Sequence, residues 1–269
     1  MANPEHVQIV LQGKDAVARW RRLNPGLRLD LTCSNLTQAE LAGVDLSGAD
    51  LTEAHLAHAY LSVANLGEAC LVEANLAGAF LFGARLGSAD LTGADATGAN
   101  LTNADLAGAR LVGADIRLAD LYQADLAGAN LESANLYRAN LTGVRAPSAS
   151  FRCANLFDAN LTGADLTRSC LSGADLFRAH LVAISLRDSD LSGALFEESV
   201  ITAVDLSTVT GLDTARHNGT SSIGTDTLEL TCRGLGGCLT PALRAFFLAA
   251  GVPAEILAAA CQSARRRES

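Results

Sequence analysis

Histidine is the residue type in this chain that could most directly support metal chemistry. His55 and His58, in "AHLAH", are three residues apart, and such a pair can bring two imidazoles to one ion. A metal site needs further ligands. In stacked coils of four pentapeptides, only amides and a glycine would lie beside the pair, at Asn35, Gln38, Asn75 and Gly78. We therefore predict no metal site here.

Cysteine could support thiol or disulfide chemistry. The seven cysteines are an odd number without regular close spacing, which favours a reducing compartment over a disulfide framework. Cys232 and Cys238, in "CRGLGGC", lack a second pair at zinc spacing, so we expect free thiols. Cys33 and Cys153 share a face but lie six coils apart, beyond disulfide reach. The sequence also contains no phosphate loop or nucleophile elbow, and we predict a non-enzyme without a cofactor.

Charge and hydropathy limit the partners. The 269-residue chain has a net charge of -9 at pH 7, which disfavours direct nucleic-acid binding. No stretch approaches the length of apolar sequence that spans a membrane, and no charged-then-apolar leader opens the chain. We expect a soluble, cytoplasmic protein that does not bind membranes.

A repeat of five residues must position whatever the surface presents. In "ANLTGADLTRSCLSGADLFRAHL", leucine recurs at every fifth position from Leu161 to Leu181, and a small residue stands two places before each. The pattern runs from Leu31 to Leu206 and matches neither the helical period of 3.6 nor the strand period of 2. One large and one small inward position in each unit predict a chain that turns a corner at each unit and coils.

The charges indicate how many units close one coil. Arg138, Asp158, Arg178 and Glu198 stand four units apart and alternate in sign, and the aromatic series Tyr137, Phe157 and Phe177 has the same spacing. Stacking at strand spacing would make these residues an ion-pair ladder and an aromatic ladder. Four pentapeptides per coil, and about nine coils over residues 27–210, therefore fit best.

The units "ADLTG", "ANLAG" and "ADLAG" resemble the pentapeptide-repeat family, whose pattern is A(D/N)LXX. The resemblance implies an all-β solenoid, a right-handed quadrilateral β-helix with leucine and alanine inside. Six of the leucine positions hold another residue, namely Ala96, Ile116, Ala146, Phe151, Phe196 and Ile201. Ala146 stands at a leucine position and Pro147 cannot donate a ladder hydrogen bond, so we expect a local irregularity that Phe151 helps to fill.

Residues 1–26 are predicted to form a helical cap on the first coil. Asn3 is placed as a helix N-cap and Pro4 as the first helical residue. A second helical segment carries apolar residues that could cover the coil: Val17, Trp20, and Leu23 or Leu27.

After residue 210 the pattern stops. Residues 211–239 are polar and glycine-rich, and we expect a linker that is mostly loop. Residues 240–269 are predicted to form a helical hairpin, with Thr240 as an N-cap and Pro253 opening the second helix. "IGTDTL" and "FFLAAGVP" resemble an extension found before TIR-type effector domains. The hairpin is either a cap or a docking or homodimer module built on Phe246, Phe247, Ile256 and Leu257.

Two surfaces are candidate partner sites. One is an acidic strip without a base until Arg110, made of Asp30, Asp50, Glu53, Glu73 and Asp90. It either binds a partner or only aids solubility. The other is a weakly charged aromatic face with Tyr60, Phe80, Phe82 and Tyr122. It is either a contact surface or a set of apolar side chains that only stack coil on coil.

Two functions follow, both of them protein binding. Some pentapeptide-repeat proteins act on DNA gyrase and confer resistance to gyrase poisons. That resemblance implies a DNA mimic whose carboxylates replace phosphates at DNA gyrase or topoisomerase IV. The alternative is a scaffold or adaptor that assembles effector partners through its coil faces or C-terminal hairpin.

Overall fold

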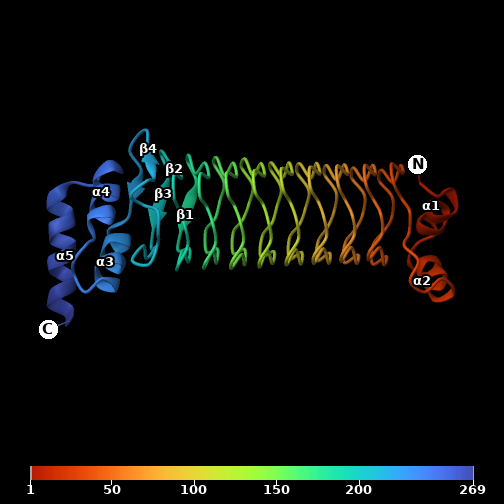
Figure 1. Cartoon of the computed structure of the whole chain (residues 1–269), viewed down its shortest axis with the longest axis horizontal. Coiled ribbons are helices and arrows are strands. Elements are labelled where there is room, and N and C mark those ends of the chain that lie inside the picture. Colours follow the sequence, from red (N-terminus) through yellow and green to blue (C-terminus); the bar gives the residue numbers. More distant parts are fainter. Residues whose placement is uncertain (1, 269) are drawn as a thin grey trace.

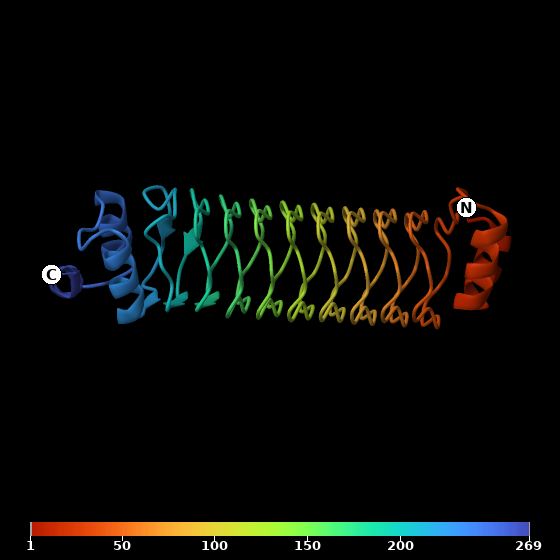
Figure 2. The same ribbon diagram turned by 90° about the horizontal axis from the view of Figure 1, so that it is seen from below.

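The computed structural model describes residues 2–268 and shows a straight rod with helices at both ends (Figure 1). At the N-terminal end lie α1 (Pro4–Leu11) and α2 (Lys14–Leu23). The coils between the ends remain in register along the rod (Figure 2). At the other end lie five short strands and three helices: β1 (His180–Val182), β2 (Leu195–Phe196), β3 (Val200–Thr202), β4 (Arg216–His217), β5 (Ser222–Ile223), α3 (Thr225–Gly234), α4 (Pro241–Ala249) and α5 (Ala254–Glu268).

Single-residue parallel bridges join the coils. They begin with Asp30 paired to Asp50 and Asn35 paired to His55, and they keep the same spacing as far as Asp190 paired to Thr210. This spacing places four pentapeptides in each turn of the chain, as the sequence predicts. Three members of the predicted ion-pair ladder follow it, because Asp158 lies 3.2 Å from Arg138 and 3.7 Å from Arg178 between charged atoms. The fourth member, Glu198, is not among the described ion pairs.

Each corner is a tight turn with one residue in the left-handed region. The leucine carbonyl accepts a hydrogen bond from the residue three places on, as Leu51 does from Ala54 at 3.0 Å. The intervening third residue has positive φ, for example 56° at Glu53, as in a type II turn. Glycine suits this place, yet Glu53, Glu73 and even Val63 occupy it at a conformational cost.

Leucine and alanine form one continuous core along the rod. Apart from the partly buried Ala39, the inward positions are almost fully buried from Leu29 to Leu206. Burying a leucine contributes roughly 1.5–3 kcal/mol, and the narrow coil accepts it because the other inward position is small. Phe151 and the smaller Ala146 are both fully buried.

The expected irregularity at Pro147 is absent, since the bridges on both sides of it keep the spacing of the other coils. Pro147 takes the second place of its turn, where proline is favoured. The N–H at that place does not join the ladder, while the Pro147 carbonyl still accepts from Gly128 N at 2.9 Å. The sequence prediction treated the residue as a ladder donor and was wrong.

The N-terminal helices contact the open edge of the first coil. Asn3 caps α1 by accepting from Glu5 N, and Pro4 is its first residue, as predicted. His6 Nδ1 accepts from Asp30 N at 2.9 Å. Val17 is buried and Trp20 partly buried, but Leu23 is 75% exposed and Leu27 is also exposed. The last two lie at and beyond the end of α2, so they do not cover the coil.

Residues 211–239 differ from the predicted loop. The chain makes one wider turn, in which Phe196 pairs with His217 and Ile201 pairs with Ile223. Compared with the regular spacing of the earlier coils, the first partner is one position further along the chain and the second is two positions further. The helix α3 follows. Its Thr227 Oγ1 accepts from Val204 N, and Thr231 Oγ1 accepts from Leu206 N at 3.1 Å. The Thr231 hydroxyl satisfies an edge amide that a further coil would have bound, whereas the Thr227 hydroxyl lies between the Val204 N–H and the Ile201 carbonyl, whose counterparts bond directly in the regular turns.

The two C-terminal helices begin as predicted. Thr240 caps α4 through Leu243 N, and α5 starts directly after Pro253. Three of the four predicted docking residues are instead core residues of the chain: Phe246, Phe247 and Leu257 are buried, and only Ile256 remains exposed. Phe246 packs edge-on against Phe196 of the coil with ring centroids 5.3 Å apart.

Candidate functional surface

The aspartates of the acidic strip have a structural task. Asp30, Asp50 and Asp90 each accept a hydrogen bond through Oδ1 from the N–H two residues on, at 3.0–3.2 Å, and from a threonine hydroxyl. Such Asx turns explain why Asp or Asn precedes most leucines. The sequence prediction saw only their charge. They remain partly exposed, so the strip keeps that charge while one oxygen of each carboxylate holds a turn.

Glu53 and Glu73 are the fully outward carboxylates of the strip. Both are exposed, and both occupy left-handed corners, at equivalent places in successive coils. Cys33 Sγ lies 3.7 Å from Glu53 Oε2. At the far end of the strip, Arg110 approaches Asp90 at 3.9 Å and donates to the Thr92 hydroxyl. The strip therefore has a free acidic part and a neutralised end.

The aromatic face has a stacked pair at its centre. The rings of Tyr60 and Phe80 lie 5.0 Å apart and 5° from parallel, and each residue is 42% exposed. Phe82 and Tyr122 are also exposed, and beside them Val63 is 58% exposed. The structure thus places the four predicted aromatic residues at the surface.

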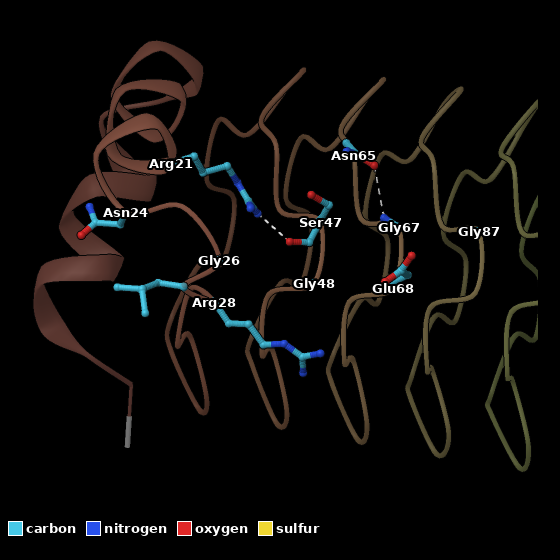
Figure 3. Close-up of a pocket in the computed structure, with 11 residues that line it drawn as sticks. Arg21, Asn24, Gly26, Arg28, Ser47, Gly48, Asn65, Gly67, Glu68 and Gly87 are labelled. Atoms are coloured by element: carbon cyan, nitrogen blue, oxygen red, sulfur yellow. Dashed lines mark hydrogen bonds between the residues drawn. The ribbon is translucent and has the colours of Figure 1, made fainter.

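An open hollow of about 460 Å³ lies where α2 meets the first coils (Figure 3). Arg21 reaches across from α2, and its Nη2 donates to the Ser47 carbonyl at 2.6 Å. The other charged residues of the lining are Arg28 and Glu68. Glycines and amides form most of the remaining wall, which presents no acid–base pair or activated nucleophile within the described lining.

Arg21 also forms an ion pair with Asp45 at 3.2 Å. Partial burial would raise the pKa of the Asp45 carboxyl, but hydrogen bonds from Ser47 and the Arg21 charge outweigh it and leave that pKa lowered. This arginine therefore fastens α2 to the coils, and Asp45 balances its charge.

The described residues contain no group of three or more histidine, cysteine or acidic side chains placed to hold a metal ion. The imidazole of His58 lies over Gly78, where an added Cβ would be 2.5 Å from Nδ1. Within the described part of the chain, no helix has the length and apolarity needed to cross a membrane.

The C-terminal end contains two features that sequence reasoning missed. Cys232 lies beside Cys261, with their Sγ atoms 3.4 Å apart. The sequence analysis considered Cys232 together with Cys238 only. His217 stacks on Phe196 and contacts the edge of Phe246, and neither ring nitrogen has a hydrogen-bond partner among the described residues. Burial lowers the pKa of His217. The spacing of these residues in the sequence contains no signal for either contact.

Comparison with known proteins identifies the family. The family described as pentapeptide repeats matches this chain in eight copies, which lie within residues 30–67, 59–95, 69–108, 81–118, 115–152 and 148–176. The chain belongs to the pentapeptide-repeat family, whose members form right-handed quadrilateral β-helices and are generally non-enzymatic structural or binding proteins. The comparison with curated proteins gave no match.

Two solved structures illustrate the similarity. HetL, a pentapeptide repeat protein involved in heterocyst differentiation regulation in the cyanobacterium Nostoc sp. strain PCC 7120, is 32% identical. That match covers 73% of this chain and 94% of HetL, with a TM-score of 0.30. QnrB1, a plasmid-mediated fluoroquinolone resistance protein, is 19% identical over 61% of this chain and 79% of its own, with a TM-score of 0.46.

Proposed function

We propose that this protein is a DNA mimic that binds the basic DNA-binding surface of a type II topoisomerase, DNA gyrase or topoisomerase IV, and modulates the action of gyrase poisons. The observation that carries the proposal is the charge of the coils at residues 29–84. They contain seven acidic residues and no basic one. A rigid rod with outward carboxylates can compete with phosphates for a basic channel.

The surface chemistry supports this function. Glu53 and Glu73 are like charges in stacked corners, which costs stability. Folding alone gives no reason for this cost. The proposal carries a cytoplasmic location with it, because the partner acts on chromosomal DNA.

The test is a supercoiling assay with purified gyrase, with and without a poison. The purified protein should inhibit supercoiling or protect the enzyme from the poison, and the effect should weaken as salt rises. A protein that leaves both activities unchanged at concentrations well above that of the enzyme would refute the proposal.

A second candidate function is a scaffold that binds a protein through the aromatic face. The Tyr60–Phe80 stack is exposed, and Val63 beside it is a β-branched residue at φ 51°. Exposed aromatic residues are enriched at interfaces. Phe80→Ser should abolish partner capture under this function and leave gyrase inhibition intact under the first.

We also propose that the terminal helices cap the rod of about nine coils, and that the C-terminal helices allow a homodimer in which Ile256 is the exposed contact. Light scattering of the full chain and of a chain without residues 240–269 separates the roles. A dimer that becomes a monomer on truncation supports the interface. A truncated chain that keeps the oligomeric state of the full chain but tends to aggregate supports a cap alone.

A further inference from the structure

The thiols of Cys232 and Cys261 lie together at the C-terminal end of the molecule. Cys232 belongs to α3 and Cys261 to α5, and their Sγ atoms are 3.4 Å apart. A disulfide bond is about 2.05 Å long, so the two sulfurs need to approach by little more than about 1 Å. Cys232 is buried, whereas Cys261 is partly exposed and open to a small reagent.

We propose that this pair is a modification site at which a low-molecular-weight disulfide, such as oxidised glutathione, forms a Cys232–Cys261 disulfide that ties α5 to α3. The Cys261 thiolate first attacks the reagent, forms a mixed disulfide and releases one reagent thiolate. Cys232 then loses its proton, and its sulfur attacks Cys261 Sγ and releases the second reagent thiolate. The two protein thiols are oxidised and the reagent is reduced to two thiols, which take up the two protons.

The environment of the pair sets the order and the pH dependence of these steps. Burial, followed by the hydrogen bond to Cys261, raises the pKa of the Cys232 thiol to about 12. The thiolate is the attacking species, so Cys232 is a poor first nucleophile and acts only on a mixed disulfide held beside it. The second step should accelerate as pH rises from 7 to 9.

The disulfide would fasten the terminal helix to the rod. The helix α3 is joined to the last narrow coil through Thr227, whose hydroxyl lies 3.2 Å from the Ile201 carbonyl. The helix α5 contacts α3 and is held further by Arg265 Nε, which donates to the Gly237 carbonyl at 2.9 Å. A bond between residues 29 positions apart restricts the freedom that α5 gains when it leaves α3.

The test treats the full chain with oxidised glutathione at pH 8 and maps its tryptic peptides by mass spectrometry. The three cysteines of this end fall on different peptides: 217–233, 234–244 and 245–265. We expect peptide 217–233 linked to 245–265, and the same link in Cys238→Ser. Cys261→Ser should lose it. Amide exchange in α5 should slow by at least about tenfold on oxidation and recover with a reductant.

Three results would overturn the proposal. A bond between Cys232 and Cys238 would show that the neighbouring loop thiol is the true partner. A glutathione adduct on Cys261 that never resolves would show that Cys232 cannot attack. A Cys232–Cys261 disulfide that leaves amide exchange in α5 unchanged would show that the bond does not tie α5 to α3. The native chain yields each result, so the test does not depend on the folding of a variant.

Discussion

The first coils (residues 29–84) and the later coils (residues 85–210) have the same kind of interior but differ in their balance of acidic and basic residues. The first coils hold seven acidic residues and no base, and only Asp45 meets an arginine, Arg21 of α2, among the described ion pairs. The later coils hold 15 acidic and 9 basic residues. Seven of their arginines form ion pairs with acids, many of them one coil away.

This difference shows that the fold requires the same interior in every coil but leaves the choice of surface charges open. Stacked columns can place opposite charges at neighbouring heights, as Arg138, Asp158 and Arg178 do. The first coils could use the same arrangement, yet they place Glu53 above Glu73 and add the exposed Tyr60–Phe80 pair. Acidic charge that no basic residue of the same coils balances indicates a surface that contacts something other than its own neighbours.

The largest predicted effect tests the shared interior. Leu71→Ala in the first coils and Leu171→Ala in the later coils should each destabilise locally by about 2–5 kcal/mol, because both side chains are fully buried among the same kinds of neighbour. Native-state hydrogen exchange would measure each coil separately. A several-fold difference between the two costs would show that the halves differ inside as well as outside.

The next effect concerns a paired acid. Asp158→Asn leaves Arg138 and Arg178 facing each other without the carboxylate between them, and should cost about 1 kcal/mol at low salt. Asparagine tolerates the left-handed φ of 57°, so backbone strain does not confuse the result. Most of the cost should disappear at high salt. A cost that is independent of salt would mean that the ladder contributes packing and not charge.

A comparably small effect concerns strain in the first coils. Val63→Gly should stabilise them by about 0.5–1 kcal/mol, since glycine adopts φ 51° freely and valine does not. Ala183→Gly, in the same column of the later coils, is the matched control and should gain less. A loss of stability at residue 63 would show that the valine side chain packs usefully against Gly83.

The smallest effect lies outside both halves, at His217. Burial lowers its folded pKa below the usual 6.5, so the neutral ring favours the folded state. Its contribution is fully present above about pH 6.5 and is lost as pH falls toward the lowered folded pKa. Hydrogen exchange in β4 and α4 should therefore speed up between pH 7 and 5, beyond the intrinsic change. His217→Phe should remove this dependence, and its persistence would assign it to another group.

The repeat made the coil predictable, because its period determines every inward residue from Leu31 to Leu206. The spacing of Arg138, Asp158 and Arg178 likewise predicted their contacts. Turn roles were harder to predict. The Asx hydrogen bond of Asp50 and the position of Pro147 in its turn both depend on which backbone N–H at a corner has no partner in the ladder.

The C-terminal end was predicted least well for a physical reason. Once the wider turn at β4 and β5 breaks the period of the coils, contacts no longer follow from spacing. The burial of Phe246 against Phe196 and the pairing of Cys232 with Cys261 arise from helices that fold back on the last coil. No local pattern in the sequence encodes either contact.

The central claim is that the acidic charge of the first coils, which no base of those coils balances, binds a type II topoisomerase. The most direct measurement compares gyrase binding over a range of salt concentrations for two fourfold variants with equal charge loss. One replaces Asp30, Asp50, Glu53 and Glu73 of the acidic strip by the matching amides, and the control does the same at Asp165, Asp190, Glu197 and Glu198.

The first variant should bind at least about tenfold more weakly, mainly through a slower on-rate, and lose much of its salt dependence. The control should stay close to the native protein, although it has lost the same charge. Equal binding and equal salt slopes for both variants would contradict the account, and the aromatic face around Phe80 would then be the better candidate.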